Sequence, residues 1–165
     1  MSSAETEVNP NGLRVVRRTI VSAYILSEDD LLLMGRQDPE RGGTWPKAWR
    51  IPGGGKEPGE TREEAMVREG REEVIGLDLR KHELTELPLK AHGAHEKTLE
   101  NGERVWQEMD FHHFMARLGG IASSFEFLPG GDLKELQWFN RQDRSGAEQI
   151  PVGRDMMLQA GLIDS

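Results

Sequence analysis

Residues 53–76 have the sequence GGGKEPGETREEAMVREGREEVIG, which is the most strongly patterned stretch of the chain. Three consecutive glycines precede a segment that holds seven glutamates between Glu57 and Glu73. Thr61 and Glu64 have the spacing of a capping box, in which each side chain accepts a hydrogen bond from the other residue's backbone amide. The pattern therefore predicts a glycine-rich turn that leads directly into an acidic helix.

The predicted helix covers residues 62–74 and stops at Gly76, because glycine favours the end of a helix. On such a helix Glu69 lies beside Glu72 and Glu73, which follow it by one turn. Three carboxylates so close together repel one another, and a bound divalent cation removes that repulsion. Mg²⁺ prefers oxygen ligands, so this face of the helix is a candidate metal site.

A second row of charged residues, each four positions apart, consists of Glu60, Glu64, Arg68 and Glu72. Arg68 can pair with a neighbouring glutamate and hold a metal-binding carboxylate in place. The preceding glycines let the backbone approach a ligand closely. Helices rich in glutamate and arginine are most often solvated surface helices. The glycine turn and the fixed spacing are what favour a metal site here.

This combination resembles the signature of the Nudix hydrolase family, which would span Gly54–Gly76. Six residues stand at signature positions: Gly54, Glu60, Arg68, Glu69, Glu72 and Glu73. Two residues depart from the signature. Gly70 replaces an apolar residue, and Ile75 delays the closing glycine by one position. Gly70 is expected to weaken the helix by about 1 kcal/mol and to remove a core contact. Neither departure removes a carboxylate.

The resemblance implies an α+β protein with the Nudix fold, an α/β/α sandwich built on a central mixed β-sheet. It also implies hydrolysis of a phosphoanhydride bond in a nucleoside diphosphate linked to another moiety. The ligands of Mg²⁺, or of Mn²⁺ as the alternative metal, would be the Gly53 carbonyl, Glu69, Glu72 and Glu73. The same resemblance gives supporting roles to Gly54 and Glu60, and a catalytic role to Arg68.

The general base of this family is either a glutamate of the helix or a carboxylate on a distal loop. The helix candidates in this chain are Glu69 and Glu72. The distal candidates are Glu126, Asp132 and Glu135, for which exposed loop charge is the alternative role.

The sequence does not distinguish between several substrate classes. These are nucleoside or deoxynucleoside triphosphates, ADP-ribose, nucleotide sugars and dinucleoside polyphosphates. An alternative function, motivated by Gly70 and Ile75, is a catalytically weak nucleotide-binding or regulatory module on the same fold. A third alternative is an isoprenoid diphosphate isomerase, but the related enzymes use a cysteine that this chain lacks. We favour the hydrolase because no carboxylate of the signature is missing.

Aromatic and basic side chains near the glycine turn are candidates for substrate binding. Trp45 can stack on a base, and Arg36 and Arg50 can bind phosphates bidentately. Arg17 and Arg18, on the first predicted strand, offer the same chemistry. For each of these arginines taken singly, surface charge is the commoner role.

The rest of the chain predicts one domain at residues 13–165, preceded by a flexible tail at residues 1–12. Expected strands, from their apolar content or alternation, are 15–26, 31–34, 83–89, 104–118 and 136–140. Residues 37–47 and 90–103 are expected to be loops, the second with a hairpin tip at Asn101-Gly102. Residues 151–163 are expected to form a closing helix.

The chain has 165 residues and a formal charge of -8. This acidity disfavours binding to nucleic acid, which requires clustered basic residues. The absence of cysteine excludes disulfides and thiolate sites. No apolar run approaches the roughly 18 residues needed to span a membrane. We therefore expect a cytoplasmic protein that does not bind membranes, with a homodimer left open because members of the family are often dimers.

Overall fold

The computed structural model describes residues 7–38 and 48–140. Its elements are β1 (Arg14–Leu26), β2 (Leu31–Gln37), β3 (Gly53–Gly55), α1 (Arg62–Glu73), β4 (Val74–Ile75), η2 (Leu79–Lys81), β5 (Glu83–Thr98), β6 (Arg104–Arg117), η3 (Ala122–Ser124), β7 (Leu128–Pro129) and β8 (Leu133–Asn140). The predicted helix at residues 151–163 and Trp45 lie outside the described residues. Within those residues, no helix is long and apolar enough to cross a membrane.

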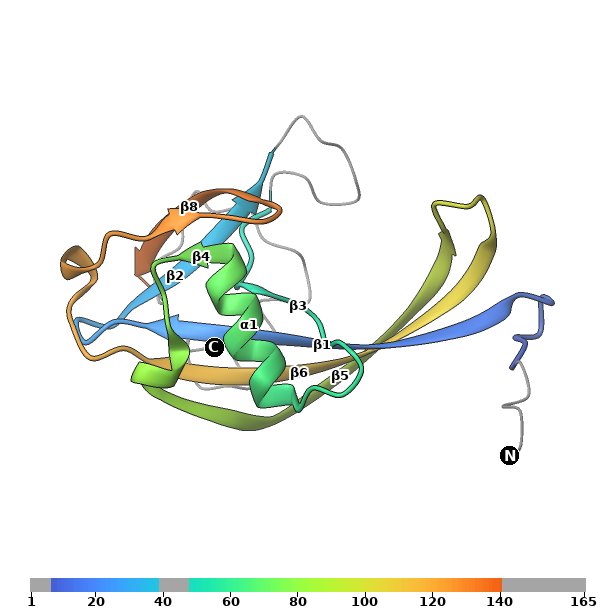
Figure 1. Ribbon diagram of the computed structural model, residues 1–165, viewed down its shortest axis with the longest axis horizontal. Coiled ribbons are helices and arrows are strands. Elements are labelled where there is room, and N and C mark those ends of the chain that lie inside the picture. Colours follow the sequence, from blue (N-terminus) through green and yellow to red (C-terminus); the bar gives the residue numbers. More distant parts are fainter. Residues whose placement is uncertain (1–6, 39–47, 141–165) are drawn as a thin grey trace.

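One mixed sheet organises these elements (Figure 1). Its strands lie in the order β5-β6-β1-β2-β8, and β3 also pairs with β1. β1 and β6 are parallel, whereas the other pairs in this sheet are antiparallel. The predicted α+β fold with a central mixed sheet is confirmed. The second helical layer of the predicted sandwich falls on residues outside the described part.

β2 leaves room for the glycine turn beside β1. It pairs with β1 only at Ile25 and Leu26. Residues 20–22 of β1 are therefore available to β3, which joins them in antiparallel register. This short pairing fixes the glycine turn at the centre of the sheet and directly in front of α1.

The acidic helix is capped as the sequence predicts. Thr61 Oγ1 accepts a hydrogen bond from the Glu64 amide at 3.1 Å, and the Glu64 carboxylate accepts one from the Thr61 amide at 2.9 Å. The helix ends at Glu73, one residue earlier than predicted, and the chain continues as β4, which pairs with β7. Gly76 then adopts a φ of +101°, a conformation that favours glycine.

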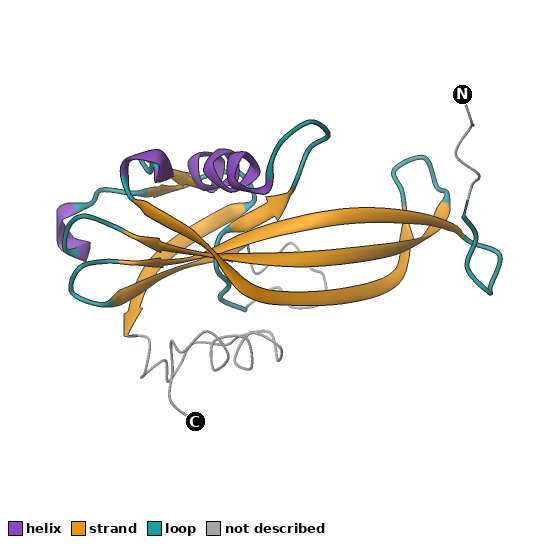
Figure 2. Cartoon of the chain, turned by 90° about the horizontal axis from the view of Figure 1, so that it is seen from below, coloured by secondary structure: helices purple, strands orange, loops and turns teal. Residues whose placement is uncertain are grey.

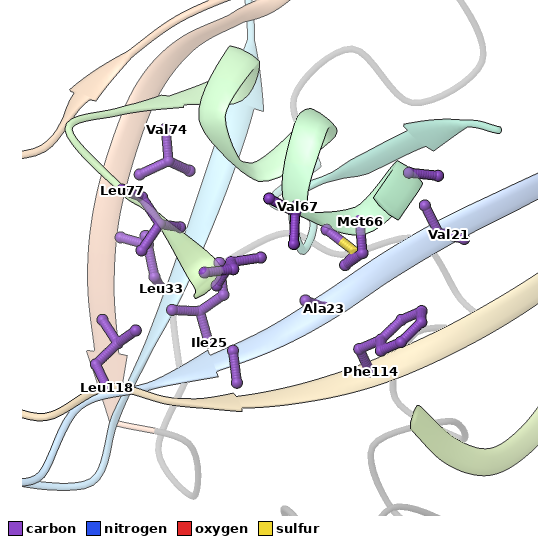
Figure 3. Close-up of a cluster of buried hydrophobic side chains, with 13 residues drawn as sticks. Val21, Ala23, Ile25, Leu33, Met66, Val67, Val74, Leu77, Phe114 and Leu118 are labelled. Carbon is purple, nitrogen blue, oxygen red and sulfur yellow. The ribbon is translucent and has the colours of Figure 1, made fainter. Parts of the chain in front are cut away.

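α1 covers one face of the sheet and buries the larger apolar core there (Figure 3). Alternate residues of β1 face this core because successive side chains of a strand point to opposite faces. The buried members are Val21, Ala23, Ile25, Leu33, Ala65, Met66, Val67, Val74, Leu77, Leu79, Phe114, Ala116 and Leu118. A second cluster on the opposite face consists of Tyr24, Leu26, Leu32, Met34, Trp49 and Met115.

The expectation that Gly70 removes a core contact was wrong. Gly70 is buried, and a Cβ at this position would lie 2.9 Å from Leu79 Cδ1 and 3.7 Å from Leu77 Cδ2. Two leucines that follow the helix therefore fill the space that the family's apolar residue would occupy.

The prediction of a loop at residues 90–103 was also wrong for most of its length. β5 continues to Thr98 in register with β6, and only the tip around Asn101-Gly102 is a turn. Polar pairs across the two strands stabilise this segment, as His92 Nδ1 and Asp110 Oδ1 do at 2.9 Å. Figure 2 shows β1, β5 and β6 extending together beyond the body of the molecule.

The Gly70 contact yields a stability prediction. Gly70→Leu should destabilise the protein by about 1–3 kcal/mol through overpacking against Leu79, although leucine is the better helix former. Urea denaturation measures this cost. In a Leu79→Ala background the same substitution should cost less, because the space is vacated. An equal cost in both backgrounds would contradict the proposed contact.

Candidate active site

The glycine turn brings the backbone of β3 against two carboxylates of α1. The Gly53 amide donates to Glu73 Oε1 at 2.7 Å. A Cβ on Gly54 would lie 2.5 Å from the Glu69 carboxylate carbon, and a Cβ on Gly53 would overlap the Val21 carbonyl. Only residues without a side chain permit this approach, which explains the adjacent glycines.

The carbonyl of Gly53 lies on the side of β3 that faces α1. In an antiparallel strand the amide and the carbonyl of one residue point to the same side. The Gly53 amide points to Glu73, so its carbonyl is oriented toward the same edge. The neighbouring groups point the other way, since Pro52 O accepts from the Ala23 amide of β1. This orientation is compatible with the predicted role of the carbonyl as a ligand.

Arg68 joins the turn to the helix carboxylates. Its Nε and Nη2 bind the Glu60 carboxylate at 2.7 and 2.9 Å, and Nη2 also donates to the Gly55 carbonyl at 2.9 Å. Its Nη1 donates to Glu69 at 3.0 Å and to Glu72 at 3.3 Å. The hydrogen bonds from Arg68 lower the pKa of Glu60 to about 2. Arg68 thus connects Glu60, Glu69, Glu72 and the Gly55 carbonyl, while the supporting role of Glu60 and the catalytic role of Arg68 stay predictions.

The pKa values of Glu69 and Glu73 are both raised above the usual value of a glutamate. Burial raises the pKa of Glu73 to about 7, and the nearby charges of Glu69 and Asp132 act in the same direction. The Gly53 amide lowers that pKa but does not offset the burial. Burial also raises the pKa of Glu69, in spite of its hydrogen bond with Arg68. The pair therefore favours a bound proton or a cation over two uncompensated charges.

Glu72 is the most exposed of the three predicted carboxylate ligands. Its side chain is 54% exposed, and its carboxylate pairs with Arg68. Within residues 7–38 and 48–140, no three acidic or histidine side chains are close enough together to hold one ion. Glu69, Glu73 and the Gly53 carbonyl nevertheless offer the oxygen ligands that a hard cation prefers. An exposed Glu72 can complete the set by rotating away from Arg68.

Asp132 is the distal carboxylate that the structure brings to the helix. It lies in the turn between β7 and β8, and its charge contributes to the raised pKa of Glu73. Glu135 instead pairs with Arg36 at 2.6 Å. Glu126 is exposed ahead of β7.

The two arginines predicted to bind substrate have different surroundings. The Arg36 guanidinium lies over the ring of Trp49, 4.8 Å from its centroid. Arg50 is half-buried, and its charge lowers the pKa of Glu73. Sequence reasoning missed this proximity of Arg50 to the carboxylates. It depends on an isolated bridge between Arg50 and Gly35 of β2, for which the sequence carries no local signal.

The NUDIX domain profile matches residues 16–157, and the chain belongs to this family. This confirms the predicted resemblance. The nucleoside triphosphatase NudI of Escherichia coli strain K12 is 47% identical over 58 residues. The matched segment covers 35% of this chain and 40% of NudI, so the chain spans less than half of this curated relative.

Solved structures share the fold. The E. coli dihydroneopterin triphosphate pyrophosphohydrolase matches with a TM-score of 0.62 and 18% identity over 86% of this chain and 92% of that one. A bifunctional NMN adenylyltransferase/ADP ribose pyrophosphatase of Francisella tularensis, complexed with AMP and a manganese ion, has a TM-score of 0.57 and 17% identity. That match covers 88% of this chain and 42% of the other. At such identities these similarities establish the fold alone.

The raised pKa of Glu73 yields a prediction about pH and stability. Glu73 binds a proton more tightly in the folded chain than at its usual pKa of 4.5, so the folded state loses stability as the pH rises from 4.5 to about 7. Glu73→Gln removes this titration and keeps an oxygen that can accept from Gly53. In chelator, the variant should gain roughly 2–3 kcal/mol relative to wild type across this range.

Chemical denaturation at a series of pH values measures the difference. Glu63→Gln, an exposed substitution on the same helix, is the matched control and should show no comparable gain. Parallel stability curves for wild type and Glu73→Gln would show that Glu73 does not titrate in this range.

Proposed function

We propose that this chain is a Mg²⁺-dependent pyrophosphohydrolase that cleaves a phosphoanhydride bond in a nucleoside diphosphate linked to another moiety. The observation that carries the proposal is the pair Glu69 and Glu73, two carboxylates with raised pKa values held against the Gly53–Gly54 backbone. A divalent cation stabilises such a pair and also serves phosphoryl chemistry. Membership of the NUDIX domain family supports the same activity.

Triphosphates are the first substrate class to test. NudI is named a nucleoside triphosphatase, and the E. coli structural relative is named a dihydroneopterin triphosphate pyrophosphohydrolase. A nucleoside triphosphate is a nucleoside diphosphate linked to a further phosphate, as the proposal requires. ADP-ribose follows, because the Francisella relative is named an ADP ribose pyrophosphatase. Nucleotide sugars and dinucleoside polyphosphates complete the panel.

The proposed ligands of the ion are Glu69, Glu73, the Gly53 carbonyl and a rotated Glu72. When bound, Mg²⁺ neutralises the diphosphate and lowers the pKa of the attacking water. Mn²⁺ is the alternative metal, and the manganese ion bound to the Francisella relative supports it.

The other residues of the site hold these ligands in place. Arg68 donates to Glu69 and to the Gly55 carbonyl, so it fixes the helix carboxylate relative to the turn. Glu60 binds two nitrogens of the same guanidinium and keeps it oriented. Gly54 contributes the absence of a side chain beside Glu69.

A carboxylate general base accepts the proton of the attacking water. On the helix the candidates are Glu69, whose raised pKa makes it a stronger base than an ordinary glutamate, and the more exposed Glu72. On the distal loop we favour Asp132, because it acts on Glu73 electrostatically.

Several further expectations stay predictions. Substrate contacts are proposed for Trp45, Arg36 and Arg50. The single domain at residues 13–165 with its tail at residues 1–12, the cytoplasmic location and a homodimer are likewise proposals.

One observation favours a second candidate function, a nucleotide-binding or regulatory module. Arg68 Nη1 donates to Glu72 as well as to Glu69, so an ion pair occupies the carboxylate that would complete the metal site. A protein in which this ion pair persisted would bind nucleotide without efficient turnover.

Activity measurements separate the two functions. We expect wild type to hydrolyse at least one member of the panel with Mg²⁺, and to stop when a chelator removes the metal. Glu72→Gln and Glu73→Gln should each lower kcat/KM by at least about a hundredfold, because each removes a proposed ligand. Formation of the phosphate-containing products is the readout: a nucleoside monophosphate together with pyrophosphate, a sugar phosphate or a second nucleotide. Glu63→Gln is the control. Nucleotide binding without turnover in wild type would instead support the module.

A further inference from the structure

Arg18 lies against the glycine turn on the side away from Glu69. It precedes Ile20 by two residues on β1, and Ile20 pairs with Gly55. Residues two apart on a strand share a face. A Cβ on Gly55 would overlap Arg18 Nη2 and would lie 3.0 Å from Arg18 Cζ. The guanidinium therefore lies directly on the backbone of Gly55.

The charge of Arg18 is not neutralised within the part of the chain that the structure describes. Arg18 is exposed, and among residues 7–38 and 48–140 it forms no ion pair. The other arginines considered as phosphate ligands are engaged differently. Arg17 pairs with two carboxylates, Arg36 pairs with one, and the charge of Arg50 acts on Glu73.

Arg18 and Glu69 lie against two consecutive residues of β3, Gly55 and Gly54, on opposite faces of the strand. Successive residues of a strand face opposite sides. Gly54 faces the Glu69 carboxylate, and Gly55 faces the Arg18 guanidinium. Consecutive Cα atoms are about 3.8 Å apart, so the two charged groups lie on opposite faces of one strand at neighbouring residues.

The proposed active site is rich in negative charge and would repel a diphosphate. Five acidic groups gather there: Glu60, Glu69, Glu72, Glu73 and Asp132. The basic groups that act on them are Arg68, Arg50 and Lys56. With a divalent cation bound, the three basic groups balance the five acidic ones, so the charge of the phosphates themselves is still to be offset. A guanidinium presents five donors in a planar arrangement that suits phosphate oxygens.

We propose that Arg18 binds a non-bridging phosphate oxygen of the substrate from the side of β3 opposite Glu69. Gly55 has no side chain, so the guanidinium can lie flat there with its outer donors directed to the ligand. Arg18 is then a substrate-binding residue that acts on affinity, while Glu69 and Glu73 act on the chemistry. This inference rests on the proposed function of the same site.

Steady-state kinetics of Arg18 variants tests the assignment. Hydrogen bonds to charged groups are worth enough that Arg18→Ala should raise KM for the triphosphate by roughly ten- to a hundredfold, with kcat within about twofold of wild type. Arg18→Lys keeps the charge and should recover part of the affinity. Arg14→Ala is the matched control, because Arg14 lies on the same face of β1 and is paired with Glu103 at 2.8 Å. It should leave KM unchanged.

The possible outcomes are distinguishable. An active wild type with an unchanged KM in both Arg18→Ala and Arg18→Gln would overturn the assignment and leave the proposed function intact. A loss of kcat at constant KM would also overturn it. If wild type hydrolyses nothing in the panel, the proposed function fails, and calorimetric titration with inorganic pyrophosphate decides the role of Arg18. Weaker binding by Arg18→Ala than by Arg14→Ala then supports it, and equal binding overturns it.

Discussion

The close approach of α1 to β3 is the constraint on which the rest of the site depends. Gly54 lets the Glu69 carboxylate rest against the strand, and the Gly53 amide fixes Glu73. Because β2 pairs with only the end of β1, β3 can occupy the centre of the sheet. The apolar face of α1 packs on the same sheet, so core packing and site geometry are set by one helix orientation.

This arrangement removes two acidic groups from water without pairing both of them. Burial of a carboxylate disfavours its charged form, and Arg68 compensates only in part because Glu60 and the Gly55 carbonyl share its donors. Such uncompensated charge commonly marks functional sites. In this chain it explains why Glu69 and Glu73 retain raised pKa values in a helix that is otherwise well capped.

The local features of the fold could be predicted from the sequence, because they depend on neighbours along the chain. The capping box at Thr61 and the family signature are of this kind. Features that depend on distant packing could not be predicted. Leu79 fills the space beside Gly70 only after the chain folds back, and the polar part of β5 is a strand because β6 supplies its partners. Helical spacing also placed Glu72 beside Glu69 and Glu73. Spacing alone does not determine that the Glu72 side chain adopts a rotamer that pairs with Arg68.

In the proposed site, burial against β3 makes Glu73 hold a proton that a metal ion must displace. Calorimetric titration with Mg²⁺ in buffers of different ionisation enthalpy measures that displacement directly. With the pKa of Glu73 at about 7, binding at about pH 6 should release close to one proton, and binding at about pH 8.5 should release almost none. Saturable binding that releases no proton at the lower pH, or no binding at either pH, would contradict the account.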